Sequence, residues 1–537
     1  MNNLRFSINL KNLQKVVSFL QNREIYIYLI VLSVVSIVTF IIYYTNGLGL
    51  SYNDARSHLD IGRRVVEGLK PGLAQLGSVW LPLPHILMIP TVWNDFMWHT
   101  GLSGALVSMI SFVITGLLIY KFLKELGVGA IGRLIGVLIF VANLNILYLQ
   151  STAMTEMLLL VTMTATVYEL LLWFKKENIL NLLKSAFFAM LSTMVRYDGW
   201  FLVMFCIALI SIEVYRKKGY KITEGVVILF ATLAGFGIFL WFLWNQLIFK
   251  DALYFMFGPF SAHTQQEQLE IAGNLATKGN LLFSIKVYLF AIAYNSNTFI
   301  ALLGLIGALI LWMDKRIKVS LKIATTALMA PLFFNILSLY LGQSVLFIQG
   351  LSGNTWFNVR YGITLMPSIA IFIGFLVDRL KTLRIVTIGL LLFVIFFSFT
   401  SLDATTIDDA KVGSSQKNVS EVSGWLNKNA KDKPGFVLIS AASHDAIIFS
   451  SGLPMSKFIH EGTGAYWEEA TTNPGHWARW IIMRTYDNQD MTYRAVSKTP
   501  DLIKYNMVGK YPFADIYELK DDYLPSLITT PILGKQK

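Results

Sequence analysis

Apolar runs of about 20 residues recur along most of this chain, and each is long enough to cross the hydrocarbon core of a bilayer. Of the 537 residues, 55% are hydrophobic and only 15% are charged. Soluble domains carry roughly 25% charged residues. The sequence therefore predicts a polytopic α-helical membrane protein, with a basic amphipathic arm over residues 1–24 before the first span.

About eleven spans are predicted. They lie near residues 25–44, 102–122, 132–149, 153–174, 181–196, 199–215, 223–245, 283–312, 321–342, 360–377 and 385–401. If the N-terminus is cytoplasmic, the Lys- and Arg-rich loops, such as 175–176, 216–218 and 315–318, all fall on the cytoplasmic side. We therefore expect a multi-pass protein of the plasma membrane with a cytoplasmic N-terminus, and the odd span count places the C-terminus outside.

The composition changes near residue 402, which predicts two domains. Residues 1–402 form the membrane domain, with a first outer loop at 47–100 and another outer loop at 246–280. Residues 403–537 form an extracytoplasmic α/β domain, within the normal size range for a domain. Its expected elements are a helix at 420–429 and strands at 435–440, 481–483 and 516–517.

The loop 246–280 has an apolar half with Phe255, Phe257 and Phe260 and a polar half with several glutamines. This pattern fits a mobile lid or a helix lying in the membrane interface, and the sequence leaves both interpretations open.

Charge and cysteine content exclude two classes of function. The net charge of +12 lies in short loops between spans, which is the positive-inside pattern and not a nucleic-acid-binding surface. The single cysteine, Cys206, excludes an intramolecular disulfide and any cysteine-based metal cluster.

Ionisable residues at the outer edge of the membrane are the candidate site. Asp54 begins the first outer loop, Glu156 starts a span, Arg196 and Asp198 lie in a short turn, and Arg360 starts a later span. The predicted topology places all five at one level, around a common cavity, and charged groups at membrane depth are costly unless they have a function. Each also has a structural explanation, as a helix cap, an ion pair in a turn or an arginine reaching lipid headgroups.

Other polar residues of the first outer loop join this set. His58 follows Asp54 by one helical turn, so both could face one site or, as a weak alternative, bind a metal at i, i+4 spacing. In the outer domain the polar pairs 444–445 and 460–461 and the aromatic residues could contact carbohydrate, although a domain core with satisfied polar residues is the favoured explanation. These outer-domain residues are His444, Asp445, His460, Glu461, Tyr466, Trp467, Trp477 and Trp480.

The chemistry that fits such a set is group transfer from a lipid-linked donor. An acceptor hydroxyl needs a general base, and a carboxylate within hydrogen-bond reach can take its proton. The planar fork of arginine suits a phosphate, and fixed arginines stabilise the charge that grows on the phosphate as it leaves.

The chain resembles the GT-C class of membrane glycosyltransferases, and within it the protein O-mannosyltransferase and aminoarabinose transferase branch. The resemblance covers essentially the whole chain and is carried by the motifs SYNDARSHLDI, TEMLLL, RYDGW and WFNVRYGITLMP, together with the outer soluble domain. It implies a polyprenyl-phosphate sugar donor and inversion at the anomeric centre. It assigns Asp54 as the base and Arg360 as the phosphate-binding residue, although many relatives have two adjacent acids where this chain has Asn53-Asp54.

We therefore expect an inverting glycosyltransferase that acts on a protein, lipid or glycan acceptor at the outer face of the membrane. The catalytic candidates are Asp54 and Glu156. The substrate-binding candidates are Arg56, His58, His85, Arg196, Asp198, Arg360 and Tyr361. No cofactor is required, a divalent metal is left open, and the expected partners are the donor, membrane lipids and the acceptor. The alternatives are a lipid or sugar transporter or flippase, and a non-catalytic envelope assembly protein.

Overall fold

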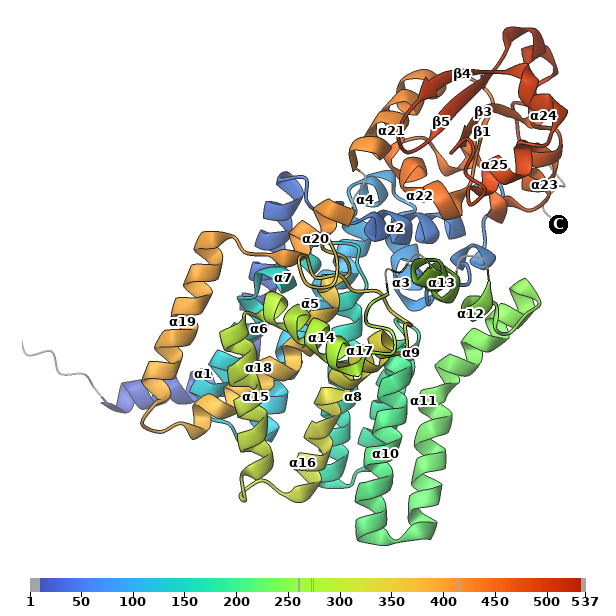
Figure 1. Ribbon diagram of the computed structural model, residues 1–537. Helices are drawn as coiled ribbons and strands as arrows, with labels where there is room; N and C mark the ends of the chain where they lie inside the picture. Colours follow the sequence, from blue (N-terminus) through green and yellow to red (C-terminus); the bar gives the residue numbers. More distant parts are fainter. Residues whose placement is uncertain (1–9, 259–260, 272, 274, 414–415, 533–537) are drawn as a thin grey trace, which may run out of the picture.

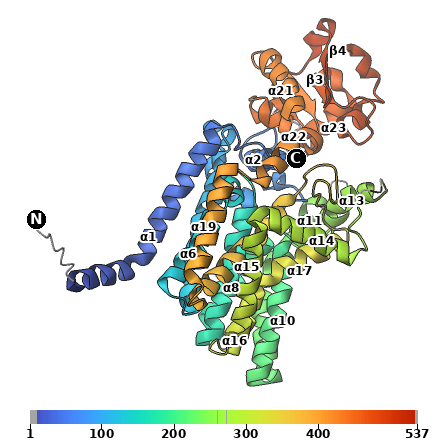
Figure 2. The same cartoon turned by 60° about the vertical axis from the view of Figure 1, so that its left-hand side comes forward.

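The computed structural model describes residues 10–258, 261–271, 273, 275–413 and 416–532. A helical bundle carries a small α/β domain at one end (Figure 1). The first nine residues of the predicted basic arm and Phe260 of the predicted lid lie outside the described residues. Turning the molecule shows the same two parts, with α2 beneath the α/β domain (Figure 2).

Eight helical segments of the described residues are long and apolar enough to cross a membrane. Five are α1 (Leu10–Thr45, apolar from Arg23), α5 (Leu102–Glu125), α8 (Glu156–Lys176), α10 (Asp198–Lys218) and α11 (Tyr220–Phe249). Two more combine α16 (Val319–Thr326), η2 (Ala327–Met329) and α17 (Ala330–Tyr340), and η3 (Val359–Leu365) and α18 (Met366–Arg379). The last contains α19 (Arg384–Ser401) and runs on into α20 (Thr405–Gly413). The predicted polytopic helical fold is confirmed.

The remaining predicted spans are bent or short, so the number eleven stays a prediction. The predicted span 283–312 is a pair, α14 (Leu281–Ser296) and α15 (Thr298–Met313), bent by 107°. Asn297, between them, has φ +71° and caps α15 by accepting from the Phe299 amide. The predicted spans 132–149 and 181–196 contain the shorter apolar helices α6 (Ala130–Val141), with α7 (Leu144–Leu149) after it, and α9 (Ile179–Thr193).

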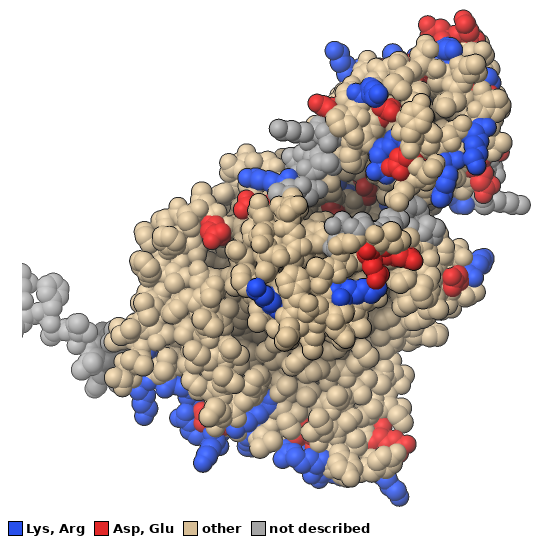
Figure 3. Space-filling model, in the orientation of Figure 1, with Lys and Arg blue, Asp and Glu red and all other residues tan. Residues whose placement is uncertain are grey.

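Ion pairs connect the loops at the end of the bundle away from the α/β domain. Lys175 bonds Glu125, Lys217 bonds Glu177, and Arg379 bonds Asp314, at 3.0, 3.3 and 2.9 Å. Lys and Arg side chains gather along this end in the space-filling view (Figure 3). The loops predicted to be cytoplasmic from their charge therefore meet at one end of the molecule.

The first outer loop folds into short elements next to the α/β domain. They are α2 (Asn53–Val66), η1 (Leu73–Leu76), α3 (Leu83–Val92) and α4 (Asp95–His99). Helix α2 packs against α22 (Ala441–Ser450) of that domain, where Arg56 Nη1 donates to Ser450 Oγ at 3.3 Å. The second outer loop holds α12 (Tyr254–Phe257) and α13 (Ala262–Ile271). Phe255 is buried among aromatic side chains, whereas Phe257 is exposed.

The α/β domain has a mixed five-stranded sheet of order β2-β1-β3-β5-β4. Strand β1 pairs in parallel with β2 and β3, and β5 pairs antiparallel with β3 and β4. The strands are β1 (Phe436–Ile439), β2 (Phe458–Ile459), β3 (Ala478–Met483), β4 (Tyr505–Lys510) and β5 (Asp515–Leu519). The other elements are α21 (Gln416–Ala430), η4 (Met455–Lys457), η5 (Glu461–Thr463), α23 (Ala465–Thr472), α24 (Pro474–Trp477), α25 (Met491–Val496), η6 (Pro500–Lys504) and η7 (Asp521–Ser526). The predicted helix 420–429 and all three predicted strands are present.

Candidate active site

Arg360 is the centre of a buried ion-pair cluster. It lies at the start of η3, where the chain enters the span that ends with α18. Its Nη2 bonds Asp54 Oδ2 at 2.6 Å and its Nε bonds Glu156 Oε1 at 3.0 Å. Its Nη1 lies 3.7 Å from Asp409 Oδ2. One guanidinium thus faces three carboxylates from three different helices.

Arg196 joins the cluster from the turn between α9 and α10. Its Nη1 bonds the same Glu156 oxygen at 3.0 Å, and its Nε lies 3.4 Å from Asp198 Oδ2. The ring of Tyr361 lies beside both guanidiniums, 4.7 Å from that of Arg196 and 5.5 Å from that of Arg360. The structure therefore brings together the five charged residues that the sequence placed at one level, with Tyr361 among them.

The acids reach this point because each begins a helix. Asp54, Glu156 and Asp198 occupy the first turns of α2, α8 and α10. A helix N-terminus carries a partial positive charge that favours an acid there. The helix N-terminus that stabilises each acid also places it in the cluster, because three helix N-termini converge on the two arginines.

The carboxylates of the cluster differ in how far they are exposed to solvent. The Asp54 side chain is 41% exposed, whereas those of Glu156 and Arg360 are 0% and 7% exposed. Asp54 Oδ1 makes no hydrogen bond to any residue in the described parts of the chain. Asp54 is therefore placed to exchange a proton with a molecule that enters the site, and Glu156 is placed to hold the two arginines.

Asp409 is a member of the cluster that the sequence analysis missed. It lies on α20, just after the last predicted span, and is 2% exposed. The single proton of Tyr52 Oη is shared between two acceptors, Asp409 Oδ2 at 3.0 Å and the Thr406 carbonyl at 2.9 Å. The available signal was the pair Asp408-Asp409 directly after an apolar span, in a segment assigned to the soluble domain.

The two predicted histidines bond each other next to the cluster. His58 Nδ1 and His85 Nε2 are 2.8 Å apart, and the ring of Trp80 lies 4.5 Å from that of His58. Burial, and then the charges of Arg360 and Arg196, lower the pKa of His58 to about 3. Burial and the neighbouring His58 also lower the pKa of His85. Both imidazoles are therefore neutral near pH 7 and offer hydrogen bonds without charge.

The structure places the predicted substrate-binding residue Arg56 away from the cluster. Arg56 Nη1 points to the α/β domain, where it bonds Ser450 Oγ, and Arg56 Nε bonds the Leu50 carbonyl within the first outer loop. For the weak metal candidates Asp54 and His58, no group of three or more His, Cys, Asp or Glu side chains in the described residues is arranged to hold a metal ion. In the α/β domain His444, His460, Tyr466, Trp477 and Trp480 are buried, which fits a domain core.

A groove of about 650 Å³ opens beside the cluster, and its wall is mostly apolar. Side chains of α14, α15, α18 and α19 line it, and its polar end contains Asn143, Asn145 and Asn295. Asn295 Nδ2 donates to the Val359 carbonyl at 2.7 Å, one residue before Arg360. Asn145 Oδ1 accepts from the Thr406 amide at 2.9 Å, on the helix that carries Asp409. The polar end of the groove thus contacts two elements of the cluster.

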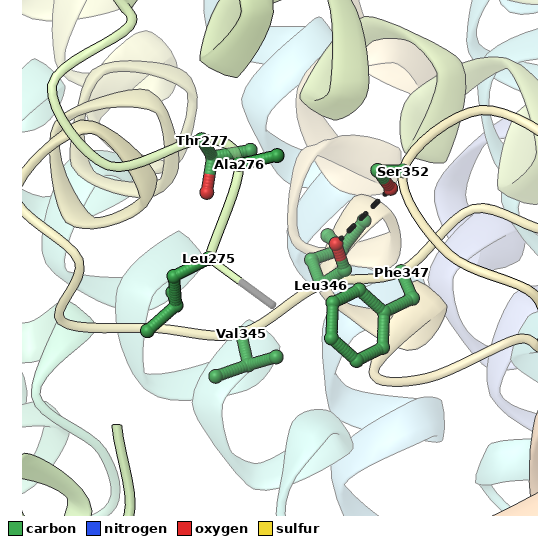
Figure 4. Close-up of a pocket in the computed structure, with 7 residues that line it drawn as sticks. All are labelled: Leu275, Ala276, Thr277, Val345, Leu346, Phe347 and Ser352. Atoms are coloured by element: carbon green, nitrogen blue, oxygen red, sulfur yellow. Dashed lines mark hydrogen bonds between the residues drawn. The ribbon is translucent and has the colours of Figure 1, made fainter. Parts of the chain in front are cut away.

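A second cavity is too small for a substrate. It lies between residues 275–277 and 345–352 and has a volume of about 10 Å³ (Figure 4). One water molecule fills such a volume. The groove, and not this cavity, has the size of a ligand site.

Comparison with known proteins finds likeness in structure and not in sequence. No protein-family model and no curated protein matches the chain. The crystal structure of ArnT from Cupriavidus metallidurans bound to undecaprenyl phosphate is similar, with a TM-score of 0.55 and 8% identity over 91% of this chain and 98% of that chain. Its apo structure has a TM-score of 0.54 and 10% identity, with the same coverage.

A second solved structure gives a lower score. The archaeal oligosaccharyltransferase AglB from Archaeoglobus fulgidus, in complex with an inhibitory peptide and a dolichol-phosphate, has a TM-score of 0.42 and 10% identity over 94% of this chain and 75% of that chain. The likeness to ArnT covers nearly the whole of both chains. This chain therefore has the GT-C fold that its motifs predicted.

Proposed function

We propose that this protein is an inverting glycosyltransferase that moves a sugar from a polyprenyl-phosphate donor to an acceptor hydroxyl. The observation that carries the proposal is the exposed carboxylate of Asp54, bonded at 2.6 Å to the buried Arg360. A base open to the acceptor and a cation for the phosphate thus lie side by side. The GT-C fold, shared with a protein crystallised with undecaprenyl phosphate, supports the same reaction class.

The two arginines supply the phosphate-binding groups. Arg196 Nη2 makes no hydrogen bond to any described residue. Among the same residues, Arg360 Nη1 faces Asp409 Oδ2 at 3.7 Å and makes no hydrogen bond, so one of its two N–H groups can point away from Asp409. These nitrogens are available to the phosphate oxygens of a donor. Tyr361 fixes both guanidinium planes by lying against them, and Glu156 holds them together from the buried side. Fixed cations of this kind stabilise the charge that develops on a leaving phosphate.

The groove is the proposed site of the polyprenyl chain. Its apolar wall matches a hydrocarbon chain, and the wall belongs to helices that are apolar enough to lie in a bilayer. Its polar end contacts η3 and α20, so a lipid phosphate at that end comes next to Arg360. A donor can then enter from the membrane without leaving the bilayer.

The proposed reaction balances as a single displacement. A lone pair of the acceptor oxygen forms the new bond to the anomeric carbon, on the side opposite the phosphate. The bond between that carbon and the phosphate oxygen breaks, and its electrons leave with the polyprenyl phosphate. Asp54 Oδ1 takes the proton of the acceptor hydroxyl, and the arginines offset the charge on the leaving phosphate.

The proposed orientation follows the charge distribution. The basic loops lie at one end of the bundle, and the cluster with the α/β domain lies at the other. The positive-inside rule then places the cluster at the outer face of the plasma membrane, with the N-terminus cytoplasmic. The boundary proposed near residue 402 follows α19, and α20, just beyond it, still contributes Asp409 to the site.

Donor turnover in the purified, lipid-reconstituted protein tests the function. A panel of polyprenyl-phosphate sugars is offered with crude acceptor, in the presence of EDTA or of a divalent metal, and release of the lipid phosphate is followed. We expect release with at least one donor, and about a 10²- to 10⁴-fold loss in Asp54→Asn, because a general base contributes about that much. Asp251→Asn, in an exposed outer loop, is the control. Turnover by Asp54→Asn at the wild-type rate would contradict the assignment of the base.

A further inference from the structure

Asp409 makes a contact that anchoring of its helix does not require. Helix α20 is already attached to the bundle through Thr406, whose amide and hydroxyl both donate to Asn145 Oδ1, at 2.9 and 2.8 Å. Asp409 instead accepts from Tyr52 and faces Arg360 Nη1 at 3.7 Å. The Tyr52 ring also lies 4.9 Å from the same guanidinium. Asp409 and Tyr52 together therefore enclose Arg360 on the side of α20.

The charge balance of the cluster makes this carboxylate unusual. Among the described residues, Asp54, Glu156, Asp198 and Asp409 face two guanidiniums, those of Arg196 and Arg360. The last three of these acids are buried. A buried charge beyond what its partners neutralise destabilises a fold. A residue retained under that penalty is expected to serve function, because functional sites often sacrifice stability.

We propose that Asp409 is a positioning residue, the counter-ion that holds Arg360 in place while Asp54 takes the acceptor proton. This inference rests on the proposed function and deepens it. When Asp54 accepts the proton it becomes neutral, and Arg360 loses the partner that it holds at 2.6 Å. Asp409 then remains, with Glu156, to keep the guanidinium fixed at the leaving phosphate. No atom of Asp409 reaches the substrate, and it acts through Arg360.

Two neighbouring acids allow a matched test. Asp409 is buried in the cluster, whereas Asp408, one residue before it, is exposed. Asp409→Asn keeps an oxygen that can accept from Tyr52 and removes the charge that faces Arg360. Tyr52→Phe removes the hydroxyl and keeps the ring beside Arg360. Asp408→Asn removes an equal charge from the same helix without touching the site.

Donor turnover and thermal unfolding of the full-length protein in detergent give separate readouts. For Asp409→Asn we expect kcat to fall about 10- to 100-fold, the range of a lost charged contact, with the donor KM within about 3-fold of wild type. We expect its melting temperature to stay unchanged or to rise, because one excess buried charge is gone. Tyr52→Phe should lose less activity than Asp409→Asn, and Asp408→Asn should match wild type in both readouts.

Two results would overturn the proposal. A melting temperature for Asp409→Asn clearly below that of Asp408→Asn would make Asp409 a structural residue. A kcat for Asp409→Asn within about 2-fold of wild type would remove its role in the reaction. If wild type turns over no donor, the proposed function fails separately, and the melting comparison still decides whether Asp409 is structural.

Discussion

Arg360 and Asp54 are 306 residues apart in the chain, and their side chains bond at 2.6 Å. One lies at the start of a membrane span and the other at the start of a helix under the α/β domain. The contact therefore joins the membrane bundle to the first outer loop. It also places a cation next to the exposed carboxylate of the cluster, and the proposed reaction depends on this pairing.

Replacing the planar guanidinium of Arg360 with an ammonium group should impair donor turnover. Arg360→Lys keeps the charge, but one ammonium cannot reproduce two separate bonds to Asp54 and Glu156. We expect kcat/KM for the donor to fall about 100-fold, as for two weakened charged contacts. Steady-state release of lipid phosphate measures the effect.

Arg316→Lys is the matched control for this substitution. Arg316 also bonds both oxygens of one carboxylate, that of Asp314, but it is exposed and lies at the opposite end of the bundle. Exposed pairs contribute little to stability, so this variant should behave as wild type. If Arg360→Lys keeps at least about a third of wild-type kcat/KM, the fork of Arg360 is not needed for the reaction.

Filling the groove should weaken binding of long-chain donors more than binding of short-chain donors. Ala301 lines the groove, and Ala301→Trp places a large ring where the proposed polyprenyl chain lies. We expect the KM of a long-chain donor to rise about 10-fold or more, since losing apolar contacts of a few CH₂ groups removes about 0.8 kcal/mol each. A short-chain donor that does not reach position 301 should be affected much less.

The control for the groove is Ile228→Trp. Ile228 is 59% exposed on α11 and does not line the groove, so its substitution adds equal bulk to the surface of the bundle. Turnover assays with a long-chain and a short-chain donor compare the variants. An equal rise in KM for both donors would show that the chain does not occupy the groove at Ala301.

Stability at low pH should depend on a buried histidine of the α/β domain. Burial, and then the charge of Arg64, lower the pKa of His460 to about 3, against an ordinary value of 6.5. The folded protein keeps this imidazole neutral, while the unfolded chain takes up a proton below pH 6.5. Its contribution to stability is therefore complete above pH 6.5 and is lost as the pH falls, by about 1.4 kcal/mol per pH unit.

His460→Asn removes this titration and keeps an acceptor for the Gly462 amide, which now bonds His460 Nδ1 at 3.1 Å. Thermal unfolding at pH 7.5, 6.5 and 5.5 should show a smaller loss of stability for the variant than for wild type. His263→Asn, at an exposed histidine, should keep the wild-type pH dependence. Parallel curves for His460→Asn and wild type would show that His460 is not buried in its neutral form.

Two predicted spans hold breaks that the sequence analysis did not resolve, and the signal was an asparagine in each. Asn143 caps α7 within the run 132–149, and Asn297 caps α15 within the run 283–312. One polar residue barely changes the mean hydropathy of a long apolar run, so the length of the run alone still predicts a single span. The cap is what ends one helix and starts the next.

The amino-acid sequence by itself determined the helical membrane fold, the strands of the α/β domain and the level of Asp54, Glu156 and Arg360. These features depend on local patterns, namely apolar length, strand composition and the acid at a helix start. Only the tertiary structure decided that Asp54 is exposed and Glu156 is covered by two arginines, that Asp409 joins them, and that Arg56 turns to Ser450. Exposure and pairing depend on neighbours hundreds of residues away, and those are set by how the helices pack.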